Sequence, residues 1–195
     1  TSATPSVCTI SGSTVTFVGI GTCTINANQA GNSSYSAATQ VVQTFSVAAK
    51  ALTITAVVSP TSIAFGGTTP TNSFTAPAIV SPDVVGSLIY TYTNNGGTTY
   101  NSTTAPTAVG NYFVTPSAAS FSTGSAVTYT ISYVAGSLSI GLASQSIVIT
   151  STPTTPTYGG SYSLTSTGGG SPNPVVYTSA TPSVCTISGS TVTFV

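Results

Sequence analysis

The chain carries the same eighteen residues twice. Residues 1–18 and residues 178–195 both read TSATPSVCTISGSTVTFV, without a substitution and at an offset of 177 positions. An identical duplication of this length indicates a repeated architecture, in which one supersecondary unit recurs along the chain. We interpret the 195 residues as one 177-residue period plus an overlap, belonging to a longer tandem array. A duplicated segment at the two ends of a single compact domain is the alternative.

Between the two copies, apolar and hydroxyl-bearing residues alternate in short runs. Examples are ALTITAVV (51–58), NYFVTP (111–116), SLSI (137–140) and PVVYTSA (174–180), and turn-forming clusters such as GGTTPTN (66–72) separate such runs. Alternation with a period of two is typical of strands with one buried face, and many short strands at near-regular spacing indicate a β-sandwich. The sequence therefore predicts an all-β fold built from antiparallel β-sandwich modules.

The offset between the copies divides the chain into three parts. Residues 49–141 hold a complete series of strands and are predicted to form one whole β module. Residues 142–195 are predicted to be the N-terminal half of a second kind of module. Residues 1–48 are predicted to be the C-terminal half of that kind of module, because residues 178–195 repeat their beginning. One period of the array thus holds two modules.

Charged residues are almost absent. The chain has one Lys or Arg, one Asp or Glu, no His and three Cys, so that charged residues make up 1% of it, against about 25% in an average soluble domain. Two charges supply neither an acid–base pair nor a charge relay, and these side chains do not complete a zinc or calcium shell. Nucleic-acid binding needs several cations. We therefore expect no enzymatic activity, no cofactor, no metal site and no nucleic-acid partner.

The two charges, Lys50 and Asp83, allow two interpretations. In the first, they are joined in an intramolecular isopeptide bond or a buried ion pair inside the module of residues 49–141. In the second, they are two ordinary surface charges. Spontaneous isopeptide chemistry requires a neighbouring carboxylic acid to shuttle protons, and the chain has no Glu and no second Asp. The composition therefore favours surface charges, which contribute little to stability.

Two stretches resemble known bacterial repeats. SATPSVCTISGSTVTFVGIGTCTINANQAGNSSYSAA is similar to the bacterial Ig-like (Big-type) repeats of large surface adhesins and other secreted multi-repeat proteins. KALTITAVVSPTSIAFGG, followed by AVGNYFVTPSAA and YTISYVAGSLSI, resembles the partner repeat called the MBG domain. The resemblance implies tandem Ig-like modules in an extended array, with a middle module that is Ig-like or β-grasp-like. It also implies a role as stalk, spacer or adhesive array outside the cell.

The three cysteines follow the duplication. Cys8 and Cys23 lie in residues 1–48, and Cys185 is the copy of Cys8. Alternation places six side chains on inward faces: Cys8, Ile10, Val15, Phe17, Cys23 and Ile25. We expect one Cys8–Cys23 disulfide per period, with the partner of Cys185 lying beyond the 195 residues. Two buried free thiols, which behave as small apolar side chains, are the alternative; the disulfide fits an oxidising, extracellular setting.

Hydroxyl- and amide-bearing residues suggest further sites. Asn32 and Asn101 each begin an N-glycosylation acceptor pattern, which arises easily in a chain rich in Ser, Thr and Asn. The whole module contains several tyrosines: Tyr90, Tyr92, Tyr100, Tyr112, Tyr129 and Tyr133. We interpret them as core and cross-strand packing with the hydroxyl at the rim. The alternative is a binding surface, in which loops such as TNNGGTTYNSTT (93–104) grip a ligand.

These observations favour a structural function. We expect a non-catalytic repeat of an extracellular bacterial fibre, stalk or surface filament, whose partners are neighbouring repeats and other copies of the chain. A net charge near zero favours such association. The alternative is an adhesive module that recognises a carbohydrate or host protein. No apolar run approaches the roughly 20 residues of a membrane-spanning helix, and the expected location is outside the cell or at its surface.

Overall fold

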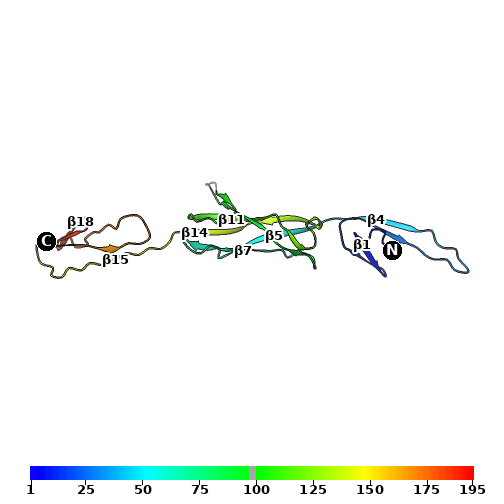
Figure 1. The fold of residues 1–195 in the computed structure, drawn as a ribbon, viewed down its shortest axis with the longest axis horizontal. Coiled ribbons are helices and arrows are strands. Elements are labelled where there is room, and N and C mark those ends of the chain that lie inside the picture. Colours follow the sequence, from blue (N-terminus) through cyan, green and yellow to red (C-terminus); the bar gives the residue numbers. More distant parts are fainter. Residues whose placement is uncertain (97–99) are drawn as a thin grey trace. The chain divides into compact units, whose positions relative to one another are not determined.

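A computed structural model describes residues 1–96 and 100–195 (Figure 1). Apart from one 3₁₀ turn at Ala126–Thr128, every regular element in the described residues is a β-strand, so the all-β prediction is confirmed. The chain divides into two compact units, Thr1–Gly141 and Leu142–Val195. The assignment of modules within these units stays a prediction.

Residues 1–48 form two hairpins. Their strands are β1 (Cys8–Ser11), β2 (Thr14–Phe17), β3 (Gly21–Ala27) and β4 (Val41–Val47). β1 pairs with β2 and β3 pairs with β4, both antiparallel. Gly12 opens the turn between β1 and β2 with a φ of +60°, which favours glycine and is typical of type II′ hairpin turns. The segment before β1 adds to β3, because the N–H of Ala3 donates to the carbonyl of Thr24 at 2.9 Å.

The central part of the chain forms two main sheets and one small pair. Its strands are β5 (Lys50–Ser59), β6 (Ser62–Ala64), β7 (Thr71–Thr75), β8 (Val84–Val85), β9 (Ile89–Asn94), β10 (Asn101–Ser102), β11 (Gly110–Ser117), β12 (Phe121–Thr123), β13 (Tyr129–Val134) and β14 (Gly136–Gly141). One sheet has the order β10-β9-β11-β14-β6, another has the order β13-β5-β7, and β12 pairs with β8. The alternating runs predicted at 51–58, 111–116 and 137–140 are strands β5, β11 and β14.

Two strand pairs depart from the antiparallel pattern that we expected. β13 runs parallel to β5, and β14 runs parallel to β6. A parallel pair requires a long crossover connection. The chain between β5 and β13 is such a connection. It forms most strands of the five-stranded sheet and then comes back to the three-stranded sheet as β13.

β5 links the two halves of the core. Four of its side chains are at most 5% exposed: Leu52, Ile54, Ala56 and Val58. At one end they belong to a buried cluster of Val58, Tyr92, Tyr112, Val114, Leu138 and Ile140. At the other end they belong to a cluster of Leu52, Ile54, Val85 and Tyr129. The outward residues of β5 are more exposed, as the period-two alternation requires.

The C-terminal unit contains the second copy of the first hairpin. Its strands are β15 (Val148–Ile149), β16 (Ser161–Ser163), β17 (Ser166–Thr167), β18 (Cys185–Ser188) and β19 (Thr191–Phe194). β18 and β19 keep the register of β1 and β2, and β16 adds to β19 as a third strand, whereas β15 pairs with β17. The strand predicted at 174–180 is absent. The first-copy counterparts of its last residues pair with β3, and this unit holds no equivalent of β3.

Candidate functional site

A disulfide between Cys8 and Cys23 joins the two hairpins of residues 1–48. Cys8 begins β1 and Cys23 lies within β3; their Cα atoms are 5.7 Å apart, and neither side chain is exposed to solvent. The hydroxyls of Ser2 and Thr4 lie 3.5 and 3.8 Å from the Cys8 sulfur. Such a bond persists where the surroundings are not reducing, so the disulfide indicates a non-reducing setting.

The other side chains predicted to face inward are less buried than these cysteines. Three are half-buried: Ile10, Val15 and Ile25. Phe17 is 58% exposed and contacts Phe45 of β4 edge to face, with ring centroids 5.8 Å apart. In the second copy, the counterpart of Val15 is Val192, which is only 4% exposed. The same hairpin is therefore covered differently at its two places in the chain.

In the C-terminal unit, β16 covers the edge of the hairpin rather than its face. Tyr162 of β16 stacks on Phe194 of β19, with ring centroids 6.0 Å apart. Cys185 is a half-exposed free thiol. Beside it lies a hollow of about 460 Å³, which we call the C-terminal hollow, and its lining includes Leu164 and Ile187. The lining also includes Cys185 and Val192, the second-copy counterparts of Cys8 and Val15.

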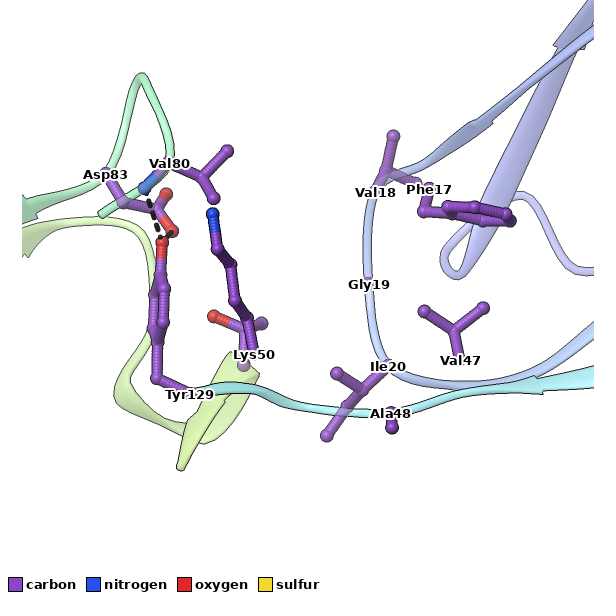
Figure 2. Close-up of a pocket in the computed structure, with 11 residues that line it drawn as sticks. Phe17, Val18, Gly19, Ile20, Val47, Ala48, Lys50, Val80, Asp83 and Tyr129 are labelled. Carbon is purple, nitrogen blue, oxygen red and sulfur yellow. Dashed lines mark hydrogen bonds between the residues drawn. The ribbon is translucent and has the colours of Figure 1, made fainter. Parts of the chain in front are cut away.

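A second hollow, of about 390 Å³, lies where β4 continues into β5 (Figure 2). The residues around it include 17–20, Val47 and Ala48 from the hairpins, and Lys50, Val80, Asp83 and Tyr129. Figure 2 shows the side chains of Lys50 and Tyr129 projecting in the same direction, toward the loop that carries Val80 and Asp83. Both charged side chains of the chain thus lie beside one hollow.

Tyr129 ties this loop to the core. Its hydroxyl donates to Oδ2 of Asp83 at 2.7 Å and accepts the N–H of Val80 at 3.1 Å. Its ring stacks on Phe121, with centroids 5.4 Å apart. Burial raises the pKa of Tyr129, the hydrogen bond to Asp83 raises it further, and the Val80 N–H acts in the opposite sense. The hydroxyl therefore stays protonated and serves as a structural donor.

The carboxylate of Asp83 also lies very close to the backbone of Gly124. A Cβ atom at Gly124 would collide with the Asp83 carboxylate, and Gly124 has a φ of +86°, which favours glycine. Lys50 is exposed, and Asp83 bonds to Tyr129 rather than to Lys50. Lys50 is therefore exposed, as the interpretation of a surface charge requires, whereas Asp83 is half-buried and bonded to the core and is not an ordinary surface charge.

The tyrosines of the central part serve packing. Three are buried, namely Tyr92, Tyr112 and Tyr129, and three are half-buried, namely Tyr90, Tyr100 and Tyr133. Their hydroxyls find partners at the rim: Tyr92 accepts from Nδ2 of Asn72 at 2.7 Å, and Tyr112 donates to the carbonyl of Ala108 at 2.8 Å. Burial raises the pKa of Tyr90. These contacts are those expected of core and cross-strand residues.

The loop proposed as a possible binding surface, residues 93–104, includes residues 97–99, which lie outside the described residues. In the described part of this loop, Tyr100 packs edge to face on Tyr112, with ring centroids 5.7 Å apart. Its hydroxyl donates to the carbonyl of Thr104 at 2.8 Å. The ring and hydroxyl of Tyr100 are therefore engaged within the protein.

Both candidate glycosylation positions are exposed. Oδ1 of Asn32 accepts the N–H groups of Ser34 and Tyr35 at 2.8 and 3.0 Å. Asn101 lies in β10, opposite Thr93 of β9. Each side chain is accessible at the surface, and modification of either stays a prediction.

Within residues 1–96 and 100–195, no group of three or more His, Cys, Asp or Glu side chains is placed to hold a metal ion. The described residues include no helix with the length and apolar character that a membrane crossing needs. Comparisons with family models, curated proteins and solved structures found no match for this chain. Its function is therefore inferred from its own residues.

Proposed function

We propose that the chain is a non-catalytic structural repeat of an extracellular bacterial fibre, stalk or surface filament, which supplies reach and cohesion through β modules arranged head to tail. One observation carries this proposal: the same eighteen residues recur at an offset of 177 and take the same hairpin register at both places. Tandem arrays repeat one supersecondary unit in this way. The resemblance to Ig-like and MBG repeats supports the same function.

The chemistry of the chain suits an extracellular array. The Cys8–Cys23 disulfide supports a non-reducing location. With one Lys or Arg and one Asp or Glu, the chain gains little stability from charge and loses little when salt or acidity changes. A net charge near zero also leaves neighbouring chains without electrostatic repulsion, which supports cohesion between filaments.

Small-angle X-ray scattering tests the proposal on polypeptides that hold an increasing number of 177-residue periods. We expect the maximum dimension to grow by a constant increment for each added period, while the radius of gyration of the cross-section stays unchanged. The 195-residue chain is the reference for the first increment. A maximum dimension that grows only as the cube root of mass contradicts the proposal, since it describes a globule. Carbohydrate binding on a glycan array would favour the adhesive alternative.

A further inference from the structure

Of all the asparagines in the chain, only Asn95 is directly followed by a glycine. The side-chain amide of an Asn lies within reach of the backbone nitrogen of the next residue. When that residue is Gly, no Cβ hinders the nitrogen, and the backbone takes up conformations that other residues avoid. The Asn95–Gly96 pair is therefore the place in this chain where a side chain and the backbone are best able to react with each other.

The structure holds this pair in the open at the end of a strand. β9 ends at Asn94, and both Asn95 and Gly96 are exposed. The N–H of Asn95 donates to the carbonyl of Asn111 at 2.9 Å, which fixes the backbone of Asn95 beside β11. Gly96 has a φ of +96°, and a Cβ atom at Gly96 would have no heavy atom of the described residues within 4 Å, its chain neighbours aside. The space around the Gly96 nitrogen is thus unobstructed.

The reacting groups of this pair are also unengaged. Among the described residues, no group bonds to the side-chain amide of Asn95 or to the N–H of Gly96. Two other exposed asparagines are held differently. Oδ1 of Asn32 accepts two backbone N–H groups, and Asn101 is followed by Ser102 within β10. Both precede a Ser, whose Cβ hinders its nitrogen.

From this geometry we infer that Asn95–Gly96 is a self-modification site, at which Asn95 is converted to a carboxylate with water as the only reagent. The Gly96 nitrogen loses its proton and attacks Cγ of Asn95; the N–Cγ bond forms, the Cγ–Nδ2 bond breaks, and Nδ2 leaves as ammonia after taking up a proton. Water then opens the cyclic imide at either carbonyl, which leaves an aspartyl or isoaspartyl residue. One water is consumed, one ammonia is released, and nothing is oxidised or reduced.

This conversion changes the charge of the repeat. Each 177-residue period holds Lys50, Asp83 and Asn95 once and has no net charge. The new carboxylate is ionised at neutral pH, so each modified period has one net negative charge. A net charge near zero favours association, whereas like charges repel. The conversion therefore weakens cohesion between filaments as they age, a consequence that rests on the proposed function.

Peptide mapping by mass spectrometry measures the conversion in the full 195-residue chain. The chain is incubated at mildly alkaline pH, which favours loss of the Gly96 proton, in water enriched in heavy oxygen. Opening of the imide then places the label in the new carboxyl group. We expect Asn95 to gain the label about tenfold faster than Asn32 or Asn101 in the same sample.

A Cβ atom beside the attacking nitrogen tests the role of the glycine. Gly96→Ala should slow the conversion of Asn95 about tenfold. Gly66→Ala is the matched control, because Gly66 also has a positive φ, of +76°, and open space around it, but follows Phe65. It introduces the same kind of backbone strain into the central part of the chain, and we expect it to leave the conversion of Asn95 unchanged.

Two substitutions of Asn95 test the effect of the charge in multi-period polypeptides. Asn95→Asp carries the charge of the product, whereas Asn95→Gln keeps a neutral amide. In sedimentation velocity at low ionic strength, we expect Asn95→Asp to associate about tenfold more weakly than Asn95→Gln. The difference should disappear at high ionic strength, because salt screens exposed charges.

Three results overturn the inference: equal labelling of Asn95 and Asn101, an unchanged rate in Gly96→Ala, or equal association of Asn95→Asp and Asn95→Gln at low ionic strength. Failure here is distinct from failure of the proposed function. Multi-period polypeptides that form rods while Asn95 stays unmodified remove the site alone. Multi-period polypeptides that collapse to globules remove the array and leave the peptide mapping unaffected.

Discussion

Removal of the Cys8–Cys23 disulfide tests how residues 1–48 are held together. The bond closes a loop with a sequence separation of 15, for which the chain-entropy model gives a stabilisation of about 3 kcal/mol. The other contacts of residues 1–17 with the β3–β4 hairpin include backbone hydrogen bonds of Thr1 and Ala3 to β3 and the ring contact between Phe17 and Phe45. Replacing both cysteines by Ala should therefore raise the equilibrium constant for opening β3 and β4 on the order of 100-fold.

Amide hydrogen exchange read by mass spectrometry measures this opening, since protection factors report local unfolding free energies. We expect peptides from β3 and β4 to lose protection by that factor. Peptides from β11 and β14 should keep theirs, because the buried cluster around Val114 and Leu138 has no contact with the disulfide.

Cys185→Ala is the matched control. It removes the same residue from the identical segment, at a position where the thiol is free and half-exposed, and we expect protection in β18 and β19 to change by no more than a few-fold. If Cys185→Ala lowers the protection of β18 and β19 as much as the double variant lowers that of β3 and β4, the disulfide does not hold residues 1–48 together. If β11 also loses protection, then the opening of residues 1–48 is coupled to the buried cluster of the central part, and our reasoning is refuted.

Three further outcomes are expected. Tyr129→Phe removes the hydrogen bond to Asp83 and should lower the free energy of unfolding by about 2 kcal/mol in a denaturant titration, whereas Tyr35→Phe, at an exposed ring, should not change it. Leu138→Ala, at a side chain that is 1% exposed, should lower the same free energy by about 2 to 5 kcal/mol. The melting temperature should be flat between about pH 5 and pH 9 and should fall above about pH 10. Because the pKa of Tyr90 and of Tyr129 is raised in the folded state, their stabilisation is complete below the unfolded pKa and is lost as pH rises through the folded one.

Alternation in the sequence predicted the strands that have one buried face. β5, β11 and β14 fall on the runs at 51–58, 111–116 and 137–140 because their inward side chains enter the core at every second position. The same pattern failed at 174–180. The alternating side chains of this segment line the C-terminal hollow. The segment is not a strand, because a strand also needs a neighbouring strand to bond its backbone N–H and C=O groups.

Contacts between distant segments were harder to predict. The parallel pairing of β13 with β5 joins Tyr129 to Lys50 across most of the central sequence, and no local pattern encodes it. The hydrogen bond from Tyr129 to Asp83 was not predicted either. One signal was present: Asp83 is the only carboxylate side chain in a chain with ten Tyr residues, and a carboxylate that is partly withdrawn from water needs a donor.

The β1–β2 and β18–β19 hairpins have turns with the same geometry, with a φ of +60° at Gly12 and +59° at Gly189, although different layers cover them. Local sequence alone therefore sets their conformation, and short loops close in microseconds or less. During synthesis, β3 and β4 would leave the ribosome after the β1–β2 hairpin, whereas β16 would leave it before the β18–β19 hairpin with which it pairs. The order of translation, rather than any difference in sequence, would then decide which neighbouring strands each of the two identical hairpins meets first.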